Sequence, residues 1–183
     1  FIIFIIISLK FVRMKKLIIL LVLFLVGFSN INAQLYGVDF DGGYRITDHW
    51  RFDAGLNYVR GERVGSVSDN LYRIAPLNGR TQVTFEHSGW MAAVEGVYYA
   101  SQDKVSEFNE EKTTPGYAIM NVRTSYQPYD GVLIALGLEN AFDRETFNHL
   151  GGLNRVRDNP DLAPNSRIPL HGRNVYTTLS LSW

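Results

Sequence analysis

Apolar and polar residues alternate with a period of two along most of this chain, which is the pattern of β-strands whose two faces meet different surroundings. In each alternating segment all charged residues share one parity, and the other parity has none. No segment after residue 34 shows helical periodicity, so the sequence predicts an all-β, antiparallel fold. The seven predicted strands are residues 36–46, 50–59, 80–86, 90–100, 117–126, 132–140 and 175–183.

Alternation also occurs in soluble antiparallel sheets. Three further features indicate that these strands cross a membrane. The segments are about as long as a tilted β-strand needs to cross a bilayer. Short connections alternate with long ones at residues 60–79, 101–116 and 141–174, as the periplasmic turns and extracellular loops of outer-membrane barrels do. Aromatic residues gather at the ends of the apolar faces, where interfacial belts lie. They are Tyr36, Trp50, Tyr58, Trp90, Tyr98, Tyr126 and Trp183.

These features predict a transmembrane β-barrel portion of about seven to eight strands in the cell outer membrane. Outer-membrane lipid is then a partner of the apolar faces, and the charged parity faces the lumen. Val132, Ile134, Leu136 and Leu138 are expected to face lipid, while Glu95, Arg123 and Glu139 face the lumen.

The first part of the chain has the arrangement of a secretory signal peptide. Met14 and two lysines precede an apolar run over residues 17–28, and small residues follow up to Ala33. The run is shorter than the roughly 20 residues of a transmembrane helix. We therefore expect a helical signal peptide at residues 14–33, cleaved between Ala33 and Gln34. Residues 1–13 are expected to be an upstream extension and residues 34–183 the barrel portion.

Composition argues against several classes of function. A net charge of zero argues against a nucleic-acid surface, which needs a basic footprint. The absence of cysteine excludes disulfides, thiolate metal sites and cysteine nucleophiles. His149 and His171 share a loop with three aspartates but lack the spacing of metal ligands, so we expect them to be solvated. The sequence thus predicts no catalytic, cofactor-binding or metal site, and no enzyme.

Several motifs in the second half of the chain resemble those of TonB-dependent receptors, the large plugged barrels of the outer membrane. Residues 73–79 are similar to a loop that these receptors carry further upstream. The order and spacing of the motifs agree with the family as well. The motif residues are Thr114, Pro115, Gly116 and Tyr117, then Glu139, Asn140, Phe142 and Asp143, and finally Gly172, Arg173 and Asn174. The terminal Trp183 resembles the aromatic assembly signal of such barrels.

The resemblance covers residues 35–183 and includes no counterpart of the family's plug domain or energy-coupling segment. It implies the C-terminal part of a barrel of 22 strands, from a receptor that imports iron–siderophore complexes, metals or cobalamin. Residues 149–156, with Arg167 and Arg173, resemble receptors described as copper-type. Because loops vary freely on a fixed scaffold, a packed extracellular loop whose glycines make turns is the favoured interpretation of that segment, and the copper-type interpretation is the alternative.

The resemblance also implies partners: the barrel assembly machinery, a small-molecule or metal-chelate ligand, and the TonB complex only in a full-length receptor. One alternative is a small stand-alone barrel with a structural or adhesive role. A barrel enzyme is a second alternative, because acidic and basic residues share the inner face. Mixed charge is however the ordinary lining of a barrel lumen, so transport is the favoured function.

Overall fold

The computed structural model describes residues 2–8, 18–26, 33–64 and 69–183. The described part is all β-strand and loop. No described helix is long and apolar enough to cross a membrane. The strands are β1 (Ile2–Ser8), β2 (Ile18–Val26), β3 (Ala33–Arg45), β4 (Trp50–Arg63), β5 (Asp69–Asn70), β6 (Asn78–His87), β7 (Trp90–Tyr99), β8 (Tyr117–Tyr129), β9 (Val132–Glu139) and β10 (Asn174–Leu181).

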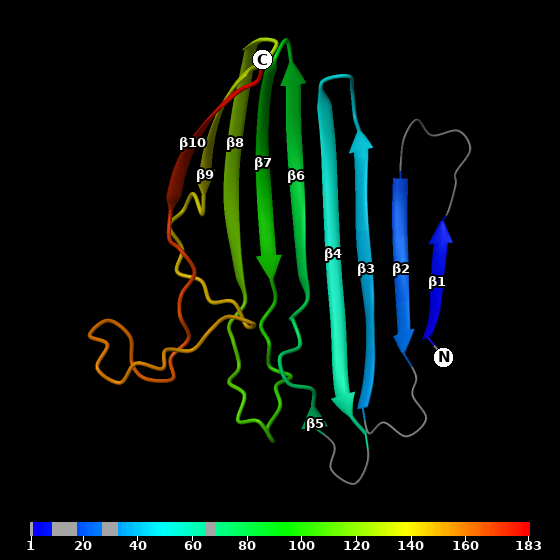
Figure 1. The fold of residues 1–183 in the computed structure, drawn as a ribbon. Helices are drawn as coiled ribbons and strands as arrows, with labels where there is room; N and C mark the ends of the chain where they lie inside the picture. Colours follow the sequence, from blue (N-terminus) through cyan, green and yellow to red (C-terminus); the bar gives the residue numbers. More distant parts are fainter. Residues whose placement is uncertain (1, 9–17, 27–32, 65–68) are drawn as a thin grey trace.

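The strands form one antiparallel sheet in which neighbours in sequence are neighbours in space (Figure 1). The path runs β1-β2-β3-β4-β6-β7-β8-β9-β10, and the short β5 pairs only with β4. The seven predicted segments correspond to β3, β4 and β6 to β10, so the predicted all-β antiparallel fold is confirmed. The short turns lie at one end of the sheet, called here the turn end, and the long loops lie at the other, the loop end (Figure 1).

The helix expected within the apolar run is wrong for Ile18–Val26, which forms strand β2 beside β3. Leu21 lies opposite Phe40 in that register. A short continuous apolar run does not distinguish a helix from a buried strand by periodicity. Here the edge of β3 offers unpaired backbone groups that an extended segment satisfies. Residues 14–17 and 27–32 lie outside the described residues, and cleavage after Ala33 stays a prediction.

The register places the uncharged parities of neighbouring strands in common rows. One row crosses five strands as Val83, Val94, Val122, Leu138 and Val175, each opposite the next. Because side chains alternate between the faces, a register shifted by one residue would break every such row. The sheet therefore carries a continuous apolar outer face.

The opposite face carries polar rows and ion pairs. Glu95 accepts hydrogen bonds from Asn121 Nδ2 at 2.8 Å and from Arg123 Nη2 at 3.1 Å. Arg51 pairs with Asp53 on the neighbouring part of this face, at 2.6 Å between Nη2 and Oδ1. The charged parity thus forms local ion pairs across and along strands.

The β6–β7 hairpin at the turn end is short because both of its turn residues adopt left-handed backbone. The β6–β7 turn consists of Ser88 at φ 47° and Gly89 at φ 79°. Positive φ at both central positions is the type I′ geometry that matches the twist of paired strands. A two-residue turn fixes the β6–β7 register, which opposes His87 to Trp90.

Candidate functional site

Three long loops come together at the loop end of the sheet (Figure 1). The first connects β4 to β6, the second spans residues 100–116, and the third spans residues 140–173. Each loop is anchored by the strands on either side, so strand register decides which loop residues meet. Loops on a rigid scaffold are the ordinary place for binding residues.

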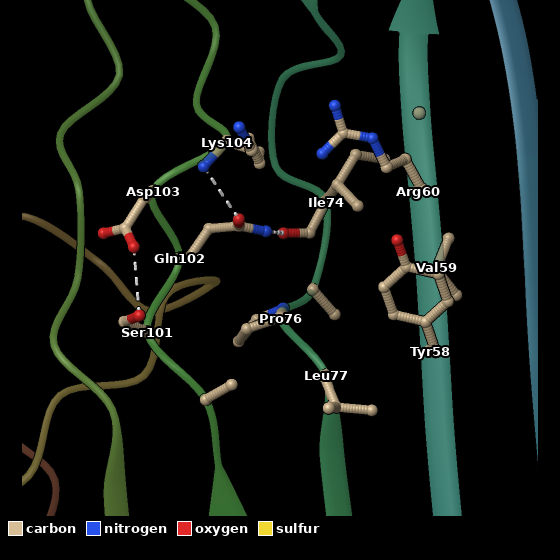
Figure 2. Close-up of a pocket in the computed structure, with 13 residues that line it drawn as sticks. Tyr58, Val59, Arg60, Ile74, Pro76, Leu77, Ser101, Gln102, Asp103 and Lys104 are labelled. Atoms are coloured by element: carbon tan, nitrogen blue, oxygen red, sulfur yellow. Dashed lines mark hydrogen bonds between the residues drawn. The ribbon is translucent and has the colours of Figure 1, made fainter.

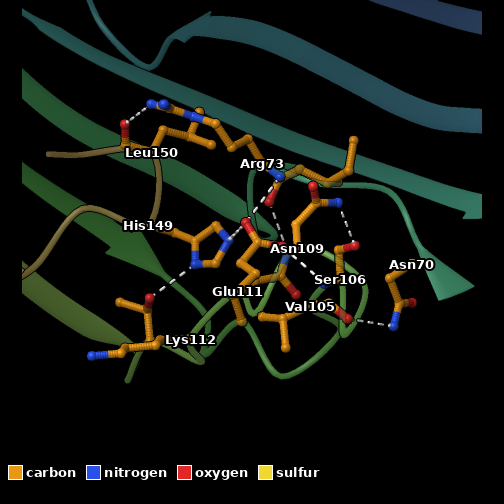
Figure 3. A network of polar contacts seen from close by, with 12 residues as sticks. Asn70, Arg73, Val105, Ser106, Asn109, Glu111, Lys112, His149 and Leu150 are labelled. Carbon is orange, nitrogen blue, oxygen red and sulfur yellow. Dashed lines mark hydrogen bonds and ion pairs between the residues drawn. The ribbon is translucent and has the colours of Figure 1, made fainter. Parts of the chain in front are cut away.

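Hydrogen bonds join the three loops to one another. Ser106 Oγ of the second loop donates to Asp69 Oδ2 of the first at 2.7 Å. Arg73 Nη2 of the first loop donates to the carbonyl of Leu150 in the third at 2.5 Å. Figure 3 shows the contact between Arg73 and Leu150 as part of a network around His149 and Glu111. The loop end is therefore a single packed surface.

The network centres on His149, whose side chain is 1% exposed and lies against Glu111, which is 5% exposed. His149 Nε2 is 3.1 Å from Glu111 Oε1. His149 Nδ1 is 2.8 Å from Thr114 Oγ1 and 3.3 Å from Arg167 Nη2. Because a guanidinium only donates hydrogen bonds, Nδ1 must be the accepting nitrogen. His149 is therefore neutral, with its proton on Nε2 and donated to Glu111.

The electrostatics lead to the same assignment. Burial, which penalises the charged imidazolium, lowers the pKa of His149 below its ordinary value of 6.5. The Glu111 carboxylate opposes this shift, while the Arg167 and Arg73 guanidinium groups add to it. A second proton on the ring would sit on Nδ1 and point at Arg167.

The loop packing is therefore expected to weaken in acid. A lowered folded-state pKa means that the contribution of neutral His149 is present above about pH 6.5 and is lost as pH falls through the folded pKa. Protection of the amides of residues 146–153, measured as exchange relative to intrinsic rates, should fall as pH is lowered from about 7.5 to about 5.5. A His149→Gln variant keeps one donor and one acceptor without titrating, so its protection should not show this fall. An equal fall in both proteins would contradict the assignment.

Glu111 connects the histidine to the other loops. Its Oε1 also accepts from the backbone N–H of Arg73 at 2.9 Å, and its Oε2 accepts from the N–H of Ser106 at 2.9 Å. One buried carboxylate thus holds a donor from each of the three loops. Such a carboxylate stabilises the arrangement because its charge is compensated by several hydrogen bonds.

A cavity of about 290 Å³ opens beside this network, between β4 and the segments 74–77 and 100–104 (Figure 2). Gln102 fixes its wall by donating from Nε2 to the carbonyl of Ile74 at 2.8 Å. Its lining is largely apolar, with both charges present: Arg60, which pairs with Glu62, and Lys104 are positive, and Asp103 is negative. The cavity suits a small ligand with an apolar body and a hydrogen-bonding group.

The motif residues around Asn140 form a second polar arrangement at the start of the third loop. The Asn140 side chain is buried, donates from Nδ2 to the Arg144 carbonyl at 2.8 Å, and accepts from the Arg144 N–H at 2.9 Å. Its own N–H donates to Asn121 Oδ1 at 3.0 Å. A φ of 48° explains why asparagine, which tolerates left-handed backbone, occupies this position.

The structure also brings the second and third motif groups together. Asp143 Oδ1 accepts from the N–H of Arg173 at 2.7 Å, and a Cβ added at Gly172 would meet that oxygen at 2.8 Å. Asn174 lies opposite Glu139 in the β9–β10 register. These contacts close the third loop at its base. Phe142 by contrast is exposed.

The first motif group lines the start of β8. Thr114 is buried against His149, and Tyr117 stacks on Tyr99 with ring centroids 4.9 Å apart. A Cβ at Gly116 would lie 2.8 Å from the Tyr99 carbonyl, so only glycine fits this close approach. Pro115 lies between Thr114 and Gly116 in the chain. The motif group as a whole positions Thr114 in the loop network.

Sequence reasoning misplaced or missed several of these residues. The expectation that His149 is solvated is wrong, because its ring is buried between two loops. His171 is exposed and lies 3.3 Å from Glu139 Oε2. Glu111 and Ser106 carried no motif or spacing that could identify them. Within the described residues, no three His, Asp or Glu side chains gather in a way that could hold a metal.

The remaining predicted positions lie away from the loops. Ala33 and Gln34 begin β3, opposite Arg63 and Glu62. Trp183 follows the end of β10 and is fully exposed. The roles of these residues in cleavage and in assembly stay predictions.

The fold identifies the class of protein as a barrel-wall sheet. It has antiparallel strands with one apolar face, short turns at one end and packed loops at the other. The family model "TonB dependent receptor-like, beta-barrel" matches residues 19–141. The chain belongs to this family, whose members are outer-membrane barrels of transport receptors and not enzymes. The family resemblance noted in the sequence is thereby confirmed. A comparison with curated protein sequences gives no match.

Solved structures of such receptors share the fold. The copper transporter OprC matches with a TM-score of 0.82 at 20% identity, over 93% of this chain and 30% of that protein. The ferric yersiniabactin uptake receptor FyuA from Yersinia pestis matches with a TM-score of 0.67 at 15% identity, over 92% and 28%. The ferric citrate transporter FecA in its unliganded form matches with a TM-score of 0.62 at 19% identity, over 89% and 28%. The chain thus spans less than a third of these proteins.

Proposed function

We propose that this chain forms part of the barrel wall of a TonB-dependent receptor in the outer membrane and contributes to nutrient uptake. The observation that carries the proposal is the continuous apolar row on a sheet that is one layer thick. An apolar sheet face must be covered by a second layer or by another apolar medium. A lipid bilayer supplies that medium, and the polar opposite face then lines the lumen.

Aromatic residues support the same placement. At the turn end, exposed Trp90 stacks on Tyr126 with ring centroids 4.3 Å apart, and Trp50 packs near Phe85. At the loop end, Tyr58 and other tyrosines project from the same face. Two aromatic belts mark the two membrane interfaces. The turn end then faces the periplasm and the loop end faces the outside.

The ligand is proposed to be a small metal-containing nutrient that reaches the loop end. The names of the similar proteins support this class, since they transport copper or take up ferric chelates. Copper is the finer proposal, resting on the OprC-like fold and on the resemblance of residues 149–156. The alternative is a small stand-alone barrel with a structural or adhesive role, which the packed loops could also serve.

The partners follow from the same proposal. Trp183, exposed after the last strand, is proposed to engage the barrel assembly machinery. The TonB complex is proposed to act only on a full-length receptor that contains this wall. Saturable, TonB-dependent uptake of ferric chelates, cobalamin or copper by cells that make the receptor would support transport over the alternative. Outer-membrane insertion without any such uptake would favour the structural role.

The proposed orientation is directly testable because the chain has no native cysteine. Asp161→Cys places a thiol in the exposed third loop, and Asp130→Cys places one in the exposed β8–β9 turn. A membrane-impermeant maleimide should label the loop thiol on intact cells and the turn thiol only after permeabilisation. The reverse pattern, or labelling of neither in the outer-membrane fraction, would contradict the placement.

A further inference from the structure

Two histidines meet at the turn end of the sheet, far from the loop network. His49 belongs to the β3–β4 turn and His87 ends β6, and both are exposed. Their ring centroids lie 4.7 Å apart with the ring planes at 84°. Both residues line one open hollow of about 370 Å³, together with Glu86 and Met91.

The backbone of β6 fixes the His49 ring. His49 Nδ1 lies 3.0 Å from the carbonyl oxygen of Glu86, and the N–H of Glu86 donates to the His49 carbonyl at 2.8 Å. Since a carbonyl only accepts, Nδ1 carries the proton and the lone pair of the neutral ring is on Nε2. Metal-binding histidines have this arrangement, in which one nitrogen donates to a carbonyl and the other binds the ion.

The distance between the rings also suits a shared ion. With metal–nitrogen bonds of about 2.0–2.1 Å, two imidazoles on one ion at a cis angle have centroids roughly 4.5–5.5 Å apart. We propose that His49 and His87 together bind a divalent transition metal, with Cu²⁺ bound more tightly than Zn²⁺ or Ni²⁺. This order follows from the general stability series for nitrogen ligands.

The site would have two protein ligands. No third His, Asp or Glu of the described chain joins these two imidazoles, so water completes the coordination. Bound metal would join the β3–β4 turn to the β6–β7 turn across the β4–β6 seam. The site is independent of the proposed uptake function, because it lies at the other end of the sheet from the loops.

The competing interpretation is that the two rings pack edge to face without any ion. Phe85 lies 6.1 Å from His49 and 6.4 Å from His87 between centroids, so an aromatic cluster does exist there. Edge-to-face pairs are themselves favourable. A His87→Phe substitution separates the two interpretations, since phenylalanine keeps the packing and cannot bind metal.

The test is Cu²⁺ titration of the refolded chain in detergent at about pH 7.5, near physiological pH. His49→Ala and His87→Phe should each weaken Cu²⁺ binding at the turn end at least about tenfold, because even the loss of a contact that supports a metal ligand weakens binding by about that much. His171→Ala, which removes an exposed histidine at the loop end, should leave the affinity unchanged. Folding of each variant is checked by heat-dependent gel mobility.

Electron paramagnetic resonance gives a second reading of the same complex. The bound Cu²⁺ should couple to two imidazole nitrogens in the native chain and to one in either variant. Unchanged affinity in His87→Phe, or a single imidazole in the native complex, would overturn the proposal. Loss of binding in His171→Ala would overturn it too, by placing the ion at the loop end.

Discussion

Replacing Val83 with arginine is expected to lower the free energy of unfolding by about 2–4 kcal/mol, the cost of a cation near the bilayer midplane on the lipid face of a barrel. Val83 is 39% exposed on the apolar face and sits near the middle of β6. Its cross-strand neighbours are Phe52 and Val94, so no acidic group is beside it to compensate the charge. Denaturant titration of the chain folded into lipid vesicles measures the change.

The adjacent residue offers a matched control. Gln82 lies opposite Asp53 on one side and Glu95 on the other, on the polar face. An arginine there meets two carboxylates and water, so Gln82→Arg should change stability by no more than about 1 kcal/mol, as surface ion pairs do. If the two arginine variants cost the same, the faces are not lipid and lumen as proposed.

The strands were predictable because apolar and polar residues alternate along them with a period of two. Within the seven predicted segments every charged residue lies on one parity of its segment, and segment 175–183 has no charged residue. Residues 18–26 were not predictable in this way, because an apolar run without alternation fits a helix and a strand equally well. Pairing with β3 decides between them, and pairing is a long-range property that local sequence does not contain.

The loop site was only partly predictable. Thr114 and Asn140 stood out by family motif, and the structure gives each a hydrogen-bonding role. His149 was recognised as a candidate but expected in water, since its partners Glu111 and Arg167 are 38 and 18 positions away. Only the sheet register brings those residues together, so their contact could not be read from spacing. Long loops offer no periodicity from which burial could be inferred.

Removing the Glu111 carboxylate is expected to separate the three loops. Glu111→Ala leaves three donors without their acceptor: the N–H of exposed Arg73, and the N–H of Ser106 and Nε2–H of His149, two residues that are buried. Each orphaned buried donor costs about 1–3 kcal/mol, which corresponds to a roughly 10- to 100-fold fall in local protection. Hydrogen exchange at the Arg73 and Ser106 amides reports the loss directly, because these amides donate to the carboxylate itself.

The control for this experiment comes from the same loop. Glu107 is exposed, and its hydrogen bond to Asp69 uses the backbone N–H and not the carboxylate. Glu107→Ala removes an equal charge and should leave both amides protected to within about threefold, since surface substitutions cost little. Protection that survives in Glu111→Ala would show that the loops hold together without the buried carboxylate. Protection lost in both variants would indicate a response to net charge, whereas loss in Glu111→Ala alone identifies this single side chain as the group that joins all three loops.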